Sequence, residues 1–265
     1  MYIEPFITSA IVVGASALAI FQLSLLLRDN GIMDVFYGLV FVLATWIMYI
    51  LHAGGSWGQA LVLLLVTLWG VRLSLRIYIK HRHRPEDWRY HAWREEWSAK
   101  GVGYFLIRSF LQIYVLQGFI IWLVLLPVTL VMTEPALIVT SPFVVLGTLF
   151  WIVGFFFEVV ADWQLDRFLK DDSNKGSIMT QGLFKYSRRP NYFGESLMWW
   201  GLGIVALGVP FGWLGLIGPV VITYVVILIT GPMLEDLWKD NEAYQEYARR
   251  TSYFIPARPR SVLTE

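Results

Sequence analysis

Long apolar stretches constrain the fold of this chain more than any other feature of its sequence. Each holds about 20 residues, enough for a helix that crosses the hydrocarbon core of a bilayer. They lie at residues 5–27, 32–51, 58–79, 104–131, 142–165, 191–209 and 212–233. Of the 265 residues 57% are hydrophobic, far above the share in a soluble domain. The sequence therefore predicts an all-α polytopic membrane bundle of about seven transmembrane helices, with residues 1–265 as a single membrane domain.

Positive charge is distributed unevenly between alternate loops. Of the 21 Lys and Arg residues, 18 fall in the segments 28–31, 80–103, 166–190 and 234–265. The intervening loops hold none. Because cytoplasmic loops of membrane proteins carry an excess of Lys and Arg, we expect the N-terminus outside and the C-terminus in the cytoplasm. This placement of cations is the one that membrane topology requires, so we expect no nucleic-acid partner.

Several kinds of site are excluded or disfavoured by composition. The chain has no cysteine, which excludes disulfides, thiolate metal sites and cysteine nucleophiles. The histidines His81, His83 and His91 have no carboxylate spacing that would support a metal, so we expect no metal site. No glycine-rich dinucleotide fingerprint follows a strand and no P-loop is present, so any nucleotide must bind between helices.

One stretch, Gly182 to Trp200, combines a basic cluster with the start of a helix. Its cations are Lys185, Arg188 and Arg189. Pro190 can open a helix as its first residue, where the missing N–H costs little. A polar stripe then follows on one helix face at Asn191, Glu195 and Trp199. We expect this stretch to bind phosphate or an anionic head group; the alternative is a positive-inside anchor with a helix cap.

Two other apolar stretches carry charged residues at helical spacing. One face of the third holds Trp69, Arg72, Arg76 and Lys80. One face of the fifth holds Glu158, Asp162 and Asp166. Three cations in line fit a polyanionic ligand lying along the helix. The alternative is that they pair with the acids in a purely structural network.

Asp34 lies near the start of the second stretch, with Tyr37 on the same face. An ionisable group at membrane depth is by default a functional candidate. The alternative is that Asp34 caps its helix at the interface. The tail after residue 233 reads as one amphipathic helix that ends before Pro256, with Glu235, Tyr244 and Tyr247 as its notable polar residues.

The residues GLFKYSRRPNYFGE at 182–195 fit the pattern G-L-[FW]-x-Y-S-R-x-P-N-Y-x-G-E. This pattern resembles the signature of the steroid 5-alpha-reductase-like membrane family, in particular its uncharacterised bacterial branch. That branch is related to isoprenylcysteine methyltransferases, which have a similar R-x-P-x-Y-x-G turn. The resemblance is clearest over residues 145–256, which would form the cofactor-binding half.

The resemblance implies a reductase that transfers a hydride from NADPH to an activated C=C bond of a steroid- or isoprenoid-like lipid. The enzyme would lie in a bacterial inner membrane with its cofactor site facing the cytoplasm. By position in the family pattern, Asp34 and Trp69 are the candidate catalytic residues, and we add Glu158 because we expect its carboxyl group near the cavity. Trp69 stands where steroid reductases place a tyrosine, and an indole N–H donates a hydrogen bond but transfers no proton. The implied cofactor-binding residues are Arg72, Arg76, Lys80, Asp162, Tyr186, Arg188, Arg189, Asn191, Tyr192, Glu195, Trp199, Glu235, Tyr244 and Tyr247.

Two other functions stay open. The methyltransferase relatives also have an acidic pair in the tail followed by Tyr-x-x-Tyr and Ile-Pro, and Glu235 and Asp236 fit that pattern about as well. An S-adenosylmethionine-dependent methyltransferase of a lipid or prenyl substrate is therefore an alternative. A non-catalytic lipid-binding membrane protein is a third. The sequence leaves the substrate and the oligomeric state open.

Overall fold

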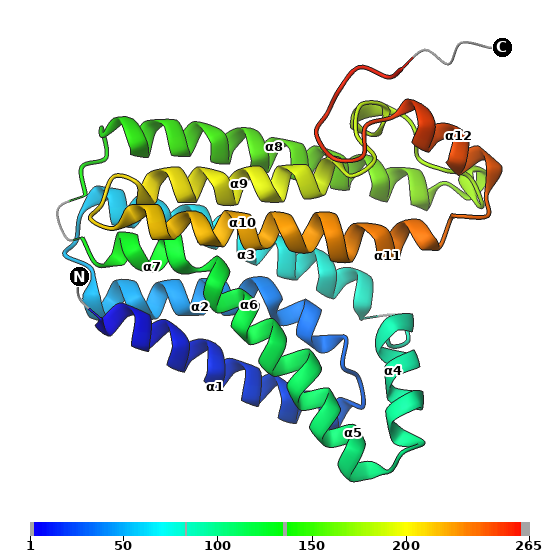
Figure 1. Ribbon diagram of the computed structural model, residues 1–265, viewed down its shortest axis with the longest axis horizontal. Coiled ribbons are helices and arrows are strands. Elements are labelled where there is room, and N and C mark those ends of the chain that lie inside the picture. The colour runs from blue at the N-terminus through cyan, green and yellow to red at the C-terminus, as the bar shows by residue number, and fades with distance from the viewer. Residues whose placement is uncertain (1–2, 83, 135–136, 261–265) are drawn as a thin grey trace.

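The computed structural model describes residues 3–82, 84–134 and 137–260, and within these ranges every regular element is helical. The long helices run back and forth along one axis, which confirms the predicted all-α bundle (Figure 1). The α-helices are α1 (Glu4–Leu27), α2 (Ile32–His52), α3 (Trp57–His81), α4 (Trp88–Ser98), α5 (Val102–Ser109), α6 (Leu116–Val124), α7 (Leu126–Met132), α8 (Pro142–Lys170), α9 (Pro190–Ala206), α10 (Ile217–Tyr224), α11 (Gly231–Asp236) and α12 (Glu242–Arg250). Shorter turns are the π-helical η1 (Phe110–Val115) and η5 (Val225–Thr230) and the 3₁₀-helical η2 (Asp172–Asn174), η3 (Gly182–Lys185) and η4 (Gly212–Leu216).

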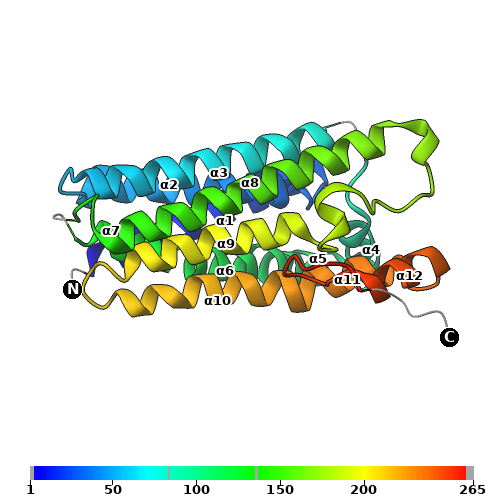
Figure 2. The same cartoon turned by 90° about the horizontal axis from the view of Figure 1, so that it is seen from above.

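Six helical segments in the described residues are long and apolar enough to cross a membrane. They are Glu4–Leu27, Ile32–His52, Trp57–His81, Val102–Val124, Pro142–Lys170 and Gly212–Met233. The remaining predicted span, 191–209, corresponds to α9, which has 17 residues and packs along α8 (Figures 1 and 2). The count of seven spans and the orientation of the termini stay predictions.

The predicted span 104–131 corresponds to the helical segment Val102–Val124, which contains the π-helical turn η1, but the prediction is wrong at its C-terminal end. The chain bends at Leu125 before a separate helix, α7. Pro127 explains this break, because it lacks the N–H that would continue the hydrogen bonds of α6. All residues of α7 are buried, so this helix contributes to the core of the bundle.

The predicted single helix in the tail is also wrong. α11 ends at Asp236, a turn follows, and α12 starts anew after Asn241, whose side chain accepts a hydrogen bond from the backbone N–H of Tyr244 at 3.0 Å. Such a side-chain cap favours a fresh helix start over continuation of the preceding one. Residues 251–260 after α12 form no helix and run back toward the loop before α9.

Glycine brings α8 and α9 into close contact. A Cβ atom at Gly194 would lie 2.5 Å from the backbone nitrogen of Glu158, closer than real Cβ contacts. Because this contact requires glycine, the helix that carries the motif lies directly against the helix that carries Glu158 and Asp162.

The charged loops gather at one end of the bundle. The turn before α2, the segment with α4, the loop between α8 and α9, and α12 all lie at the end opposite the N-terminus (Figure 1). This arrangement agrees with the alternation of charge along the sequence. It brings the motif, the tail and the cationic end of α3 to the same region of the molecule.

Candidate functional site

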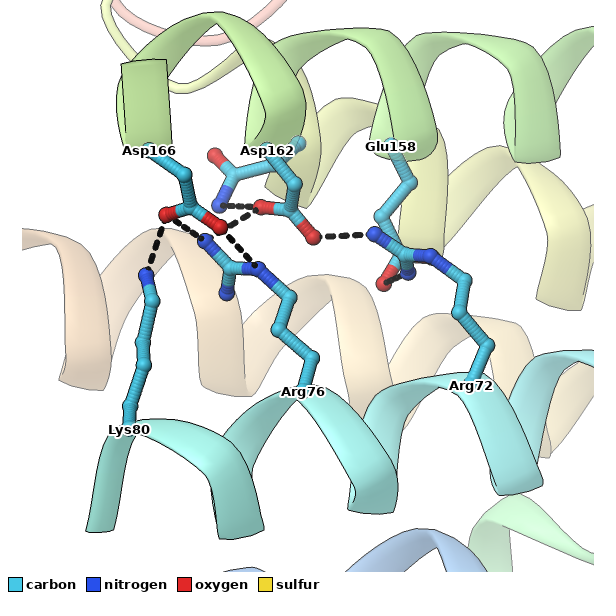
Figure 3. A network of polar contacts seen from close by, with 7 residues as sticks. Arg72, Arg76, Lys80, Glu158, Asp162 and Asp166 are labelled. Carbon is cyan, nitrogen blue, oxygen red and sulfur yellow. Dashed lines mark hydrogen bonds and ion pairs between the residues drawn. The ribbon is translucent and has the colours of Figure 1, made fainter. Parts of the chain in front are cut away.

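A ladder of ion pairs joins α3 to α8 (Figure 3). Arg72 donates to Glu158, with 2.6 Å between Nη1 and Oε1, and also to Asp162. Arg76 lies 3.2 Å from Asp162 and 3.0 Å from Asp166, and Lys80 lies 2.5 Å from Asp166. The side chains of Glu158 and Asp162 are only 5% exposed. Each of the three cations on α3 thus has an acid opposite it on α8, because both sets of residues are spaced about one helical turn apart.

This pairing changes the interpretation of the α3 cations. The sequence predicts that Arg72, Arg76 and Lys80 receive a polyanionic ligand, with pairing to the acids as the alternative. In the structure all three are paired, so a ligand at this ladder would have to displace a carboxylate. Asn191, from the start of α9, joins the ladder by donating from Nδ2 to Asp162 Oδ1 at 3.4 Å.

The start of α9 offers two arginines that are less fully engaged. Pro190 is the first residue of the helix, as predicted, and Arg189 directly precedes it. Arg188 and Arg189 are both half-buried, and the Nε atom of each is buried without a hydrogen-bond partner in the described part of the chain. Arg189 also forms no ion pair with any described carboxylate. A helix N-terminus flanked by incompletely bonded arginines is a favourable environment for an anion.

The tail docks on this motif. Arg188 Nη1 lies 2.7 Å from Glu235 Oε1, and Tyr244 donates to the same oxygen at 3.0 Å. Tyr247 donates to the backbone carbonyl of Phe184 at 2.6 Å. Burial raises the pKa of both phenols above its ordinary value, so they are hydrogen-bond donors at neutral pH. Glu235, Tyr244 and Tyr247, all predicted to bind cofactor, therefore hold the tail against the motif.

Part of this docking is not predictable from the sequence. Tyr253 donates to the backbone carbonyl of Ile227 at 2.7 Å, and the guanidinium of Arg188 lies 4.9 Å from the centre of its ring. Arg188 N also donates to Ser252 O at 2.8 Å. No spacing in the sequence indicates these contacts, because they join segments that meet only when the tail folds back.

Aromatic side chains pack beside the buried end of the ladder. Trp69 is 2% exposed, and its ring lies 5.2 Å from those of Phe41 and Trp199 and 6.5 Å from that of Tyr37. The Trp69 Nε1 atom and the Glu158 Oε2 atom are buried without a hydrogen-bond partner among the residues with described structure. A buried donor or acceptor left unbonded costs free energy, so both atoms indicate a place for a bound polar group.

Glu195 lies close to this cluster. Glu158, Asp162, Arg72 and the Tyr37 phenol are near enough to interact with it electrostatically. Within the described ranges, however, its carboxyl group forms neither a hydrogen bond nor an ion pair. The structure thus brings Glu195 near Glu158, two residues that the sequence marks as candidates in separate stretches.

Asp34 has a different environment. Its Oδ1 accepts a hydrogen bond from Tyr90 at 2.7 Å, and its Oδ2 accepts one from Arg89 at 3.0 Å. Burial and then the charge of Asp34 raise the pKa of Tyr90 well above its ordinary value, which keeps this phenol a donor. Asp34 does not cap its own helix, since α2 has no side-chain cap. It instead anchors α4 to the start of α2.

Two predicted cofactor residues flank the motif arginines. Tyr186 is 41% exposed, and its backbone carbonyl accepts a hydrogen bond from Ala257 N at 2.9 Å. Tyr192 is half-buried on the first turn of α9 and lies within electrostatic range of Arg189. The predicted residues thus form one connected region from the motif to Trp69, and Asp34 lies at its edge, within electrostatic range of Tyr37.

A separate hollow of about 400 Å³ lies between α1, η1 and α6. Its lining is apolar and includes Val13, Gly14, Phe119 and Trp122. It holds no ionisable group of the predicted site, so the chemistry considered below does not involve it.

Comparison with protein families matches residues 20–251 to a family described as a protein of unknown function, DUF1295. Comparison with curated proteins and with solved structures finds no match. The family match covers the motif, the ladder and most of the tail.

Proposed function

We propose that this chain, which belongs to the DUF1295 family of membrane proteins of unknown function, is a membrane-embedded reductase. It would transfer a hydride from NADPH to an activated C=C bond of a steroid- or isoprenoid-like lipid. The cofactor would enter from the cytoplasm, in a bacterial inner membrane, and the substrate from the bilayer. The resemblance of residues 182–195 to the reductase signature supports this reaction class.

The observation that carries the proposal is the pair of buried, partnerless Nε atoms of Arg188 and Arg189 at the start of α9. A dinucleotide needs cations and free backbone N–H groups for its phosphates, and a helix N-terminus beside arginines supplies both. Arg189 has no acid to compete with such a ligand among the described carboxylates. The residues present therefore fit the phosphate part of NADPH.

The other end of the region fits the reacting part. The buried rings of Trp69 and Trp199 pack edge to face, with 5.2 Å between their centres. Trp199 lies one helical turn after Glu195, whose carboxyl group has no partner in the described structure. NADPH, when bound, supplies the hydride. As negative charge develops on the carbonyl oxygen conjugated to the C=C bond, the Trp69 N–H can donate a hydrogen bond to it. One such donor is worth roughly 3–4 kcal/mol of barrier.

The reduction also needs a proton at the α-carbon, which Trp69 cannot supply. Both carboxylate oxygens of Asp34 already accept hydrogen bonds from Arg89 and Tyr90 of α4. We therefore assign this proton to Glu195 instead of Asp34. Glu158, held by Arg72, would make a second negative charge on Glu195 unfavourable, because like charges repel. The positive charge of Arg72 offsets one negative charge beside Glu195. This lowers the free energy that is needed to bury Glu158 and Glu195 together.

Cofactor binding tests the proposal. Full-length protein purified in detergent is titrated with NADPH, and the Kd is measured for the wild type, for Arg189→Ala and for Lys170→Ala. Lys170 is an exposed cation at the same end of the bundle and serves as the control. We expect Arg189→Ala to raise the Kd about tenfold or more, since a charged hydrogen bond contributes about 1.5–3 kcal/mol. The control should stay within about twofold, as is usual for a single exposed cation.

The same titration separates the alternatives. Binding of S-adenosylhomocysteine without binding of NADPH would favour the methyltransferase. Binding of neither, with lipid alone retained through purification, would favour a non-catalytic lipid-binding protein. Either result would overturn the reductase proposal.

A further inference from the structure

A second hollow lies at the charged end of the molecule and borders the predicted cofactor region at Tyr247. It is a cleft of about 310 Å³ between the motif loop, α12 and the end of the tail. The cleft is lined by Thr180, Lys185, Ala243, Glu246, Tyr247, Arg250, Thr251 and Pro259. The basic cluster that the sequence shows at 185–189 is thus divided. Arg188 and Arg189 have buried Nε atoms at the start of α9, whereas Lys185 is exposed in this cleft.

The folded-back tail concentrates positive charge around the cleft. Ala257 N donates to Tyr186 O and Arg260 N donates to Arg250 O, both at 2.9 Å. These bonds place the last described residues of the tail beside the motif loop and the end of α12. Lys185 and Arg250 line the cleft, and the exposed residues Arg249, Arg258 and Arg260 are next in the chain to residues that line it.

Most of this charge is not neutralised by the protein. Arg250 pairs with Glu246 at 2.5 Å, and this pair is about half exposed. The other four cations form no ion pair with a carboxylate in the described ranges. A protein surface that holds several unpaired cations around a concave site attracts a polyanion.

Aromatic and aliphatic side chains at the same end indicate which polyanion. Tyr186, Trp238 and Ile255 are 41%, 37% and 65% exposed. Exposed Trp and Tyr next to cations are typical of the level of lipid head groups. We propose that the cleft between Lys185 and Arg250 binds the phosphate of an anionic phospholipid. The hydroxyl groups of Thr180 and Thr251 can donate to its oxygens. This site is independent of the proposed reductase activity.

Binding of a defined lipid tests the site. The full-length protein in detergent is titrated with short-chain phosphatidylglycerol and, separately, with phosphatidylcholine of the same chain length. We expect tighter binding of phosphatidylglycerol. Lys185→Glu should weaken it by about tenfold or more, because each Lys or Arg near an anionic head group contributes on the order of a fivefold change. Lys185→Arg should stay within about twofold of wild type, since it keeps the charge.

Lys170→Glu is the matched control, with the same change of charge on an exposed cation outside the cleft. Lys185 is exposed, so its variants should melt at the wild-type temperature. If Lys185→Glu fails to fold, Arg250→Gln is the second test and should weaken phosphatidylglycerol binding by about fivefold. Equal binding of the two lipids, or equal effects of Lys170→Glu and Lys185→Glu, would overturn the proposal.

A further titration with adenosine 2′,5′-bisphosphate distinguishes a soluble nucleotide from a lipid. Loss of nucleotide binding in Lys185→Glu with unchanged phosphatidylglycerol binding would assign the phosphate to a nucleotide and refute the lipid site. Loss of phosphatidylglycerol binding with unchanged nucleotide binding would support it.

Discussion

The guanidinium of Arg188 and the carboxylate of Glu235 form an ion pair, with 2.7 Å between Nη1 and Oε1, that joins the motif loop to the end of α11. Tyr244 donates to the same carboxylate, so three segments meet at one acid. Only 14% of the Arg188 side chain and 25% of that of Glu235 are exposed. The tail thus covers the arginines that we assign to cofactor phosphates, and its docking and cofactor binding should depend on each other.

Removal of the Glu235 charge tests this docking. Glu235→Gln leaves a half-buried guanidinium without its counter-charge, so we expect a loss of about 1–3 kcal/mol of stability. Glu246→Gln is the control because its pair with Arg250 is about half exposed, and it should cost at most about 1 kcal/mol. Melting temperatures in detergent compare the two. Equal shifts would mean that the Arg188–Glu235 pair contributes no more than an exposed one.

The ladder between α3 and α8 should be strongest at its buried end. Arg72→Ala removes the partner of Glu158 and one partner of Asp162, and we expect a loss of about 3–5 kcal/mol. Lys80→Ala removes a cation whose side chain is 36% exposed, and we expect a loss of about 1 kcal/mol or less. Denaturant titration of both variants measures the difference. A larger loss for Lys80→Ala would contradict the assignment of the buried end.

Because α8 and α9 pack closely at Gly194, we expect replacement of this glycine to lower stability. Gly194→Ala places a Cβ atom 2.5 Å from the Glu158 backbone nitrogen, and the helices must separate, at a cost of about 1–3 kcal/mol. Gly14→Ala in α1 is the control, because a Cβ atom there meets nothing within 4 Å. We expect that variant to be neutral or more stable by up to about 1 kcal/mol, since alanine favours a helix. Similar melting temperatures for the two variants would show that the close contact at Gly194 does not affect stability.

The sequence was sufficient for the features that depend on local spacing. Hydrophobic runs gave most of the long helices, Pro190 gave the start of α9, and helical periodicity put Arg72 on a face that could meet Glu158. Pro127 also marks the break at Leu125 in the sequence, since proline cannot continue a helix. The continuous apolar run around it nevertheless predicts one long helix.

Features that depend on tertiary contact could not be read in this way. Asp34 looked like a lone membrane acid because its partners, Arg89 and Tyr90, lie on another helix more than fifty positions along the chain. The sequence does not indicate the end of α11, because the tail is amphipathic both before and after Asn241 and therefore resembles one helix. The division of the basic cluster into Arg188 and Arg189 on one side and Lys185 on the other depends on how the tail folds back.

The assignment of Trp69 as the hydrogen-bond donor to the developing oxyanion can be tested by substitution. Trp69→Phe keeps an aromatic ring but removes the N–H, so turnover of an enone lipid should fall about a hundredfold, as for loss of one oxyanion donor. The NADPH Kd should change little, because the lost bond forms mainly in the transition state. Trp151→Phe, at a buried tryptophan stacked on Phe155, controls for the change in volume.

Asp34→Asn completes the comparison. Its amide oxygen can accept a hydrogen bond from only one of Tyr90 and Arg89, because the amide nitrogen donates, and the charge that pairs with Arg89 is lost. We expect turnover within about threefold of wild type and a lower melting temperature, since an ion pair of this exposure contributes about 1 kcal/mol. Loss of turnover at normal melting temperature and normal NADPH affinity would instead make Asp34 the acid of the reaction. In that case α4, which anchors to Asp34, would be part of the active site.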